Sequence, residues 1–409
     1  MTHVPDRLAE VIRTEGTLIL ATLVRILGDL QIAEDAVQEA AIRALRQWPV
    51  SGVPDSPRAW LTVTAKRAAI DALRRESVRT SRERDAVHLD FDEPSEQVLR
   101  DDMLRLIFTC AHPALSLESR VVLALRTLCG LSTTELAVVL LTTESAVAKR
   151  LTRTRTKIAR AGIPYEIPPD DELPQRLSAV CAVLHAAYTS AHTASGRAWL
   201  SDVDGCREAI RLARLVCTLM PDEAAPMAVL SLMLLTEARR SARTDGNGGP
   251  VPLAEQNRHA WDAAMIEQGR MLLNESLRRT GCVADPYQLQ AAIAAEHAVA
   301  PGYAETDWAE VVRLYDLLVD VHPSSAARLA RAVAVGELAG PVAGLTELAH
   351  CKLGAGDHRW HAVRGELLAR MGCFDDAVAA MEASLTSAVN APEAAHRRRL
   401  IAEWTRREP

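Results

Sequence analysis

The segment from Leu131 to Arg160 constrains the fold of this chain more than any other. Ser132 and Glu135 have the spacing of a capping box, in which each side chain accepts a hydrogen bond from the other residue's amide. Thr142 and Thr143 then form a turn, and apolar residues at helical spacing predict a second helix with a buried stripe of Val147, Leu151 and Ile158. Two helices joined in this way form a helix-turn-helix, whose second helix fits the major groove of DNA.

The second helix of this motif is strongly basic. No acidic residue lies between Ser145 and Arg160, whereas six cations do: Lys149, Arg150, Arg153, Arg155, Lys157 and Arg160. Such a helix either faces solvent or binds DNA phosphates. Binding to phosphates is favoured because it releases the counterions condensed on the DNA. Helical spacing places five candidates for base contacts opposite the apolar stripe: Ser145, Ala148, Lys149, Thr152 and Arg153. Arg150 and Arg155 are candidates for holding the DNA backbone.

A second basic helix is predicted after a proline-rich loop at residues 49–57. Its cations outnumber its acids and comprise Lys66, Arg67, Arg74, Arg75, Arg79, Arg82 and Arg84. Trp48 and Trp60 flank the loop. Aromatic rings beside a basic groove can stack on unpaired bases, but a place in the core is the favoured alternative for each tryptophan taken singly.

An acidic stripe lies on an earlier helix. Asp35, Gln38 and Glu39 share one face at spacings of three and four residues, while Ala36, Val37 and Ala40 point inward. Acids do not favour DNA binding, so this stripe faces either a basic protein partner or water.

Composition favours an all-α fold with a division of charge. Of the 409 residues, 48% are hydrophobic but only 4% aromatic, and apolar residues recur at helical spacing. Residues 1–160 hold 23 basic and 21 acidic residues, whereas residues 161–409 hold 24 and 32, so the net charge of −6 arises in the second part. This asymmetry predicts a nucleic-acid-binding part joined to one with a different partner.

Several classes of protein are disfavoured. The eight cysteines lack metal-ligand spacing and are expected to be buried and reduced, and no catalytic grouping or phosphate-binding loop is present. We therefore expect no enzyme activity, no cofactor and no metal. The absence of a signal peptide or long apolar segment predicts a cytoplasmic protein.

The pattern divides the chain into five parts. These are a helical domain at 1–85, a linker at 86–97, a helix-turn-helix domain at 98–163, a linker at 164–174 and a helical domain at 175–409. In the last part, Pro221 and Pro323 end similar helices 102 residues apart, three times the 34-residue tetratricopeptide (TPR) period. Residues 372–381 match the glycine and small-residue spacing of that repeat. A generic helical bundle is the alternative.

In order and spacing, these motifs resemble the sigma factors of bacterial RNA polymerase of the extracytoplasmic-function (ECF) type, over residues 7–160. Residues 33–39 resemble the domain-2 helix that docks on the clamp helices of the polymerase, which implies core binding by Asp35, Gln38 and Glu39. Residues 57–75 resemble the helix that melts and holds the −10 element, which implies this role for Trp60, Lys66, Arg67, Arg74 and Arg75. Residues 131–158 resemble domain 4, which reads the −35 element.

The second part resembles the long TPR-like extension of one ECF subgroup. The similar stretches are residues 234–243, 261–262, 286–295 and 307–308. The resemblance implies promoter recognition with core polymerase, under control in cis by the extension, which contacts the sigma domains or a regulatory protein. Two alternatives remain: a stand-alone helix-turn-helix regulator with a TPR sensor, which would bind a palindrome, and a TPR adaptor with no dependence on DNA.

Overall fold

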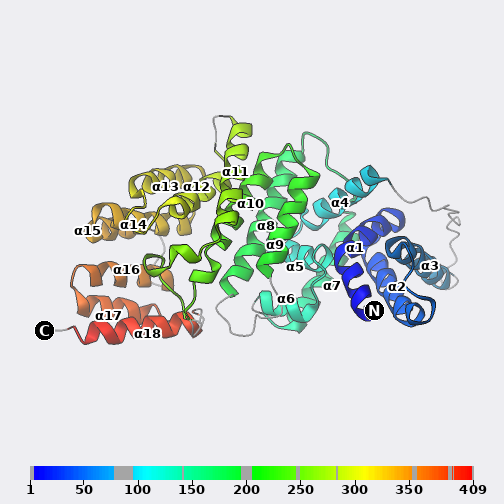
Figure 1. Cartoon of the computed structure of the whole chain (residues 1–409), viewed down its shortest axis with the longest axis horizontal. Helices are drawn as coiled ribbons and strands as arrows, with labels where there is room; N and C mark the ends of the chain where they lie inside the picture. Colours follow the sequence, from blue (N-terminus) through cyan, green and yellow to red (C-terminus); the bar gives the residue numbers. More distant parts are fainter. Residues whose placement is uncertain are drawn as a thin grey trace. The chain divides into compact units, whose positions relative to one another are not determined.

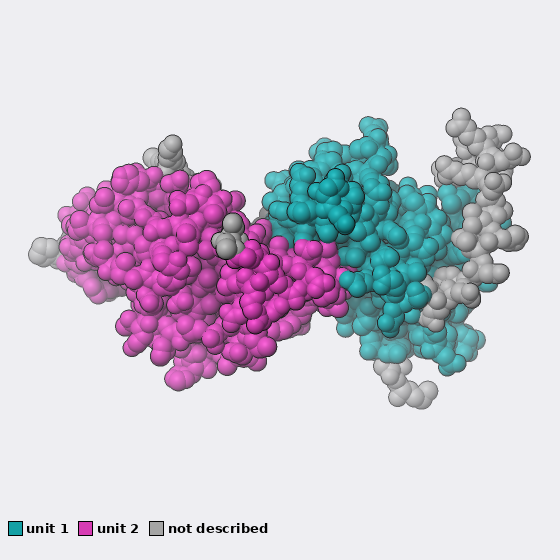
Figure 2. All heavy atoms as spheres, turned by 90° about the horizontal axis from the view of Figure 1, so that it is seen from above, with its two compact units in different colours: residues 1–190 teal, residues 191–409 magenta. Residues whose placement is uncertain are grey.

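The computed structural model describes residues 4–77, 95–140, 142–194, 205–245, 249–281, 284–351, 357–385, 389 and 391–407. Over these residues the regular elements are helices, accompanied by an isolated β-bridge between Thr244 and Pro250. The prediction of an all-α protein is therefore confirmed. The chain forms two compact units, unit 1 at residues 1–190 and unit 2 at residues 191–409, coloured separately in Figure 2.

Unit 1 begins with three helices that pack on one another: α1 (Val4–Leu27), α2 (Leu30–Ser51) and α3 (Pro57–Ser77) (Figure 1). Gly28 ends α1 with a φ of 68°, and the Asp29 carboxylate caps α2 by accepting from the amides of Gln31 and Ile32. Four buried alanines one turn apart allow α2 to approach its neighbours closely: Ala33, Ala36, Ala40 and Ala44.

The predicted loop at 49–57 was wrong over its first three residues. Helix α2 continues through Pro49 to Ser51 and ends at Gly52, whose φ is 82° and whose amide donates to the Trp48 carbonyl. A proline in the last turn removes one amide donor from the helix, and Gly52 supplies the conformation that ends it.

The helix-turn-helix is part of a second group of helices in unit 1: α4 (Glu96–Cys110), α5 (Leu117–Thr127), α6 (Thr133–Val139) and α7 (Glu144–Ala161). Both hydrogen bonds of the predicted capping box are present, from the Glu135 amide to Ser132 Oγ at 3.2 Å and from the Ser132 amide to Glu135 Oε2 at 2.7 Å. Thr143 caps α7, and the predicted stripe is buried: Val147, Leu151 and Ile158.

Polar contacts join these two groups of helices within unit 1. Arg25 of α1 reaches the fully buried carboxylate of Asp102 in α4 at 2.8 Å, and Thr17 donates to the Leu128 carbonyl at 3.1 Å. The following helix, α8 (Leu173–Ala194), is tied to α4 by a hydrogen bond from Arg176 to the Phe108 carbonyl at 3.2 Å. The division between the units falls inside α8, after the segment 164–174 that was predicted as a linker.

Unit 2 contains short helices that pack chiefly on their neighbours in the chain (Figure 1). They are α9 (Gly205–Leu219), α10 (Ala224–Glu237), η1 (Arg240–Ala242), η2 (Leu253–Glu255), η3 (Arg258–Ala260), α11 (Ala263–Thr280), α12 (Pro286–Val299), α13 (Trp308–Val321), α14 (Ser325–Ala339), α15 (Pro341–Ala349), α16 (His358–Arg370), α17 (Phe374–Ala383) and α18 (Ala391–Thr405). Neighbour-to-neighbour packing is typical of helical-repeat proteins and differs from that of a single bundle.

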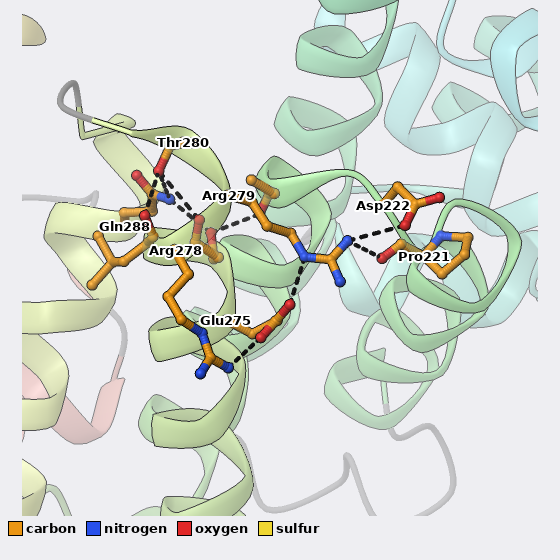
Figure 3. A network of polar contacts seen from close by, with 10 residues as sticks. Pro221, Asp222, Glu275, Arg278, Arg279, Thr280 and Gln288 are labelled. Carbon is orange, nitrogen blue, oxygen red and sulfur yellow. Dashed lines mark hydrogen bonds and ion pairs between the residues drawn. The ribbon is translucent and has the colours of Figure 1, made fainter.

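Polar side chains, both buried and exposed, link successive helices of unit 2. Gln288 of α12 donates to Ser276 Oγ and to Thr280 Oγ1 of α11, each at 2.8 Å (Figure 3). Arg279 donates to the Pro221 carbonyl at 2.7 Å and binds Glu275, so the end of α11 is held against the turn before α10 (Figure 3). Gln288 and Ser276 are buried, so their hydrogen bond fixes one register between α11 and α12, whereas Arg279 makes its contacts at the surface.

Candidate nucleic-acid interface

Helix α7 presents its predicted base-contacting residues to solvent. Ser145, Ala148, Lys149, Thr152 and Arg153 are all exposed, while Arg150 and Arg155 are partly buried. The residues opposite them form the buried stripe, so the amphipathic pattern alone fixes the orientation of this face.

The cations of α7 differ in their partners. Arg150 lies 3.3 Å from Glu118 of α5, Arg155 forms an ion pair with Glu34 of α2, and Lys157 donates to the Ala114 carbonyl. Within the described residues, no ion-pair partner is present for Lys149, Arg153 or Arg160. Sequence reasoning found no acid on the helix itself, but it missed the acids that other helices bring to it.

A hollow of about 470 Å³ lies between α5 and α7. Its polar lining includes the hydroxyls of Ser116 and Ser119 next to Lys149, Arg150 and Arg153. Hydroxyls and cations together are the groups that usually hold DNA phosphates. The two serines were not singled out from the sequence, although Ser116 occupies the N-cap position of α5.

Helix α3 exposes only part of its predicted basic surface. Arg67 and Arg74 are exposed, whereas Lys66 is only 8% exposed. Arg75 belongs to α3, but its side chain lies outside the described residues, as do Arg79, Arg82 and Arg84. In the part of α3 that the structure describes, two of the predicted cations, both arginines, are therefore exposed to solvent.

The two tryptophans meet each other. Trp48 is 1% exposed and belongs to the core, while Trp60 is partly buried, and their ring centroids lie 5.5 Å apart in an edge-to-face arrangement. Of the two interpretations given to Trp48, the place in the core is the one observed. Trp60, at the start of α3, retains some exposure beside the loop.

Helix α2 carries both an exposed stripe and a buried acid. Asp35 and Gln38 are exposed, and Glu39 is partly buried and lies 2.9 Å from Arg43. Glu34 instead pairs with Arg155 and accepts a hydrogen bond from Thr127 Oγ1 at 3.3 Å. Burial raises the pKa of Glu34, and the nearby Arg155 and Arg126 oppose this rise.

Two of the predicted domains match known families of sigma-factor domains. Residues 11–79 match the model of sigma-70 region 2, and residues 105–158 match that of sigma-70 region 4. Residues 176–277 match a family of unknown function, DUF6596. The chain is therefore a sigma factor of RNA polymerase, and its partners are core polymerase and promoter DNA.

Two relatives define the type more closely. A probable ECF RNA polymerase sigma factor, SigI of Mycobacterium tuberculosis, is 30% identical over 171 residues, which cover 40% of this chain and 58% of SigI. The uncharacterised protein R00370 of Rhizobium meliloti is 38% identical over 390 residues, 92% of this chain and 91% of that protein. The chain belongs to the ECF-type sigma factors that carry a C-terminal extension, and its similarity to R00370 runs through that extension.

None of the helices in the described part of the chain is both long and apolar enough to cross a membrane.

Proposed function

We propose that this alternative sigma factor recognises promoters through α3 and α7 while α2 attaches it to core polymerase. The observation that carries the proposal is the exposed face of α7, on which Lys149 and Arg153 have no ion-pair partner among the described residues. Phosphates and guanine edges supply the charge and acceptors that such residues lack. On α3, the exposed side chains of Arg67 and Arg74 are the proposed contacts near the −10 element.

For core binding, the exposed stripe on α2 is the proposed contact. Asp35 and Gln38 project to solvent from a helix whose alanine face is fully packed, so this stripe is available to a basic partner without rearrangement of α2. Glu39 lies at the edge of this stripe and forms an ion pair with Arg43.

For regulation, unit 2 is proposed to control the sigma domains in cis as a TPR-like helical repeat. Its neighbour-to-neighbour packing supports the repeat, and the acidic excess of residues 161–409 supplies a charge opposite to that of α3 and α7. The predicted domain limits at 85, 97, 163 and 174 belong to the same proposal.

Run-off transcription with purified core polymerase tests the proposal. Candidate promoters come from mapping the 5′ ends of transcripts made on genomic DNA, and the full-length chain is then compared with a truncation after Ala194, which retains α8. Core-dependent transcripts from either protein support the sigma mechanism, and a difference between the two reveals control by unit 2. Transcripts that are identical in yield and start site would remove the proposal of control in cis.

A further inference from the structure

A segment that follows the helix-turn-helix touches both groups of helices in unit 1, α1–α3 and α4–α7. This segment, which we call the clasp, comprises residues 163–176 and includes the predicted linker at 164–174. The carbonyl of Pro164 accepts a hydrogen bond from the fully buried Thr109 of α4 at 3.1 Å. At the other end of the clasp, Arg176 is 7% exposed and donates to the backbone of α4 at 3.2 Å. Both ends of the clasp are therefore anchored on α4.

Between these anchors the clasp reaches α2. The amide of Leu30, in the first turn of α2, donates to the hydroxyl of Tyr165 at 3.2 Å. The first amides of a helix have no partner within the helix, and Asp29 accepts only from the two that follow Leu30. The Tyr165 hydroxyl thus supplies the acceptor that the start of α2 lacks. Burial raises the pKa of Tyr165, so the phenol remains neutral near pH 7.

Ion pairs lie in the same contact between the two groups. Glu34 of α2 binds Arg155 of α7, and their side chains are only 12% and 20% exposed. Arg25 of α1 binds Asp102 of α4, whose side chain is fully buried. Removing such charges from water costs free energy, which their mutual attraction offsets only in part. The contact is therefore closed in this structure, but its charged pairs also favour hydration when it opens.

In this closed arrangement, α3 and α7 lie too close together for the promoter contacts proposed above. Helix α3 packs on α2, and α7 reaches α2 through Arg155. Both DNA-binding helices thus lie beside one helix of 22 residues, which is about 33 Å long. Promoter elements two helical turns apart are separated by about 70 Å of DNA. Reading both elements requires α7 to leave α2. Residues 78–94 join the two groups, so this separation breaks no described helix.

We propose that the clasp holds unit 1 closed and releases α2 at Tyr165 when the chain engages both promoter elements. Because its anchors lie on α4, the clasp moves with α4–α7, and the hydrogen bond from Leu30 breaks as the groups separate. Water then replaces the Tyr165 hydroxyl at this amide. The clasp acts within unit 1 and needs no contact with unit 2. The inference rests on the proposed function, since only a chain that reads two separated elements has to open.

Single-molecule fluorescence transfer distinguishes the closed and open forms. Dyes are attached through azide-bearing residues at two exposed positions, Ala9 of α1 and Gln97 of α4, one in each group. The full-length protein is measured alone, and then in complex with core polymerase and a promoter obtained by run-off transcription. We expect mainly high transfer in the free protein and mainly low transfer in the complex.

Substitutions at Tyr165 assign the closed form to the clasp. Tyr165→Phe keeps the ring but removes the acceptor for Leu30, which should raise the ratio of open to closed free molecules about fivefold. Tyr165→Ala also removes the ring and should raise this ratio further. Tyr315→Phe, on α13 of unit 2, is the matched control and should leave the ratio unchanged. Circular dichroism and thermal unfolding check that each variant folds.

The proposal is overturned by low transfer in the free unaltered protein, by an unchanged ratio in both Tyr165 variants, or by high transfer that persists in complexes producing transcripts. A failure of the proposed function gives a different result. In that case no core-dependent transcript forms, and the ratio in the free protein still reports on the clasp. A ratio that responds to Tyr165 would then support the clasp and contradict the promoter mechanism.

Discussion

Arg155 illustrates, at the residue scale, what a sequence pattern leaves undetermined. Its place in an acid-free basic helix predicts a contact with the DNA backbone. In the folded chain its guanidinium binds Glu34, which lies 121 positions away on α2. Helical spacing identifies the helix face on which a residue lies. Which acid pairs with that residue depends on packing between helices that are distant in sequence. The contact between Arg155 and the DNA backbone therefore remains a prediction. To form it, a DNA phosphate would have to compete with Glu34 for the guanidinium.

A double-mutant cycle measures this competition. Glu34→Gln should strengthen binding to duplex DNA carrying the −35 element by roughly threefold or more, because it removes the carboxylate that competes with phosphate for Arg155. The same substitution should have no effect when Arg155 is already glutamine. Fluorescence anisotropy of labelled duplex gives all four affinities. An equal gain in both backgrounds would show that Arg155 does not contact the DNA.

A second prediction at this scale concerns pH. Burial and nearby arginines lower the pKa of His192 to about 3, below its ordinary value of 6.5, so the unfolded state binds the extra proton first as pH falls. Stability should therefore decrease from pH 6.5 to pH 5, by up to about 2 kcal/mol at 1.36 kcal/mol per pH unit. His192→Gln should reduce this slope in thermal unfolding but not abolish it, because burial also lowers the pKa of His297, to about 4, whereas His259→Gln, at an exposed histidine, should leave the slope unchanged. Equal slopes in all three proteins would contradict the account.

At the scale of elements, local signals predicted the helix starts better than the helix ends. The capping box at Ser132 and the apolar stripe of α7 depend on residues within a few positions of one another, and both are observed. The end of α2 depends on Gly52 as well as on Pro49, so the first proline did not mark it. Lys66 shares a helix face with Ala69, Ile70 and Leu73, so the spacing in α3 indicated an inward position, and its burial follows that spacing rather than its charge.

The exposed face of α7 gives a direct prediction. Lys149→Ala and Arg153→Ala together should weaken binding to a −35 duplex by about tenfold or more, and should relax discrimination between base pairs within the element. Arg13→Ala, which removes an exposed cation from α1, serves as the control. Anisotropy with the −35 duplex and with base-pair variants of it provides the measurement. Affinity and base-pair discrimination identical to those of the unaltered protein would exclude these residues from the interface.

Close packing between α14 and α15 supplies a second prediction for the elements. A Cβ atom on Gly344 would lie 2.9 Å from the Cα atom of Gly336 and 3.1 Å from the Ala332 carbonyl oxygen. Gly344→Ala should therefore destabilise unit 2 by about 1–3 kcal/mol. Gly16→Ala in α1, where the added methyl has ordinary contacts, should stabilise its helix by up to about 1 kcal/mol. Thermal unfolding of both variants distinguishes steric overlap from a general effect of alanine.

At the scale of the whole molecule, the division of charge coincides with the division between the sigma regions and the extension. The first 160 residues contain both sigma regions, whereas the acidic excess lies in the part that carries the extension. The all-α class followed from helical spacing throughout the chain. Unit 2 also contains a hollow of about 1300 Å³, which could not be predicted from helical spacing. Its lining residues, among them His192, Tyr303 and Glu366, come from segments far apart in sequence.

The central claim is that the chain selects promoters as part of RNA polymerase, and a footprint tests it most directly. Hydroxyl-radical footprinting on a promoter obtained by run-off transcription is carried out with and without core polymerase. We predict protection of two different elements about two helical turns apart, and only when core is present. Protection of a palindrome by the chain alone, unchanged by core, would contradict the account and favour a stand-alone regulator.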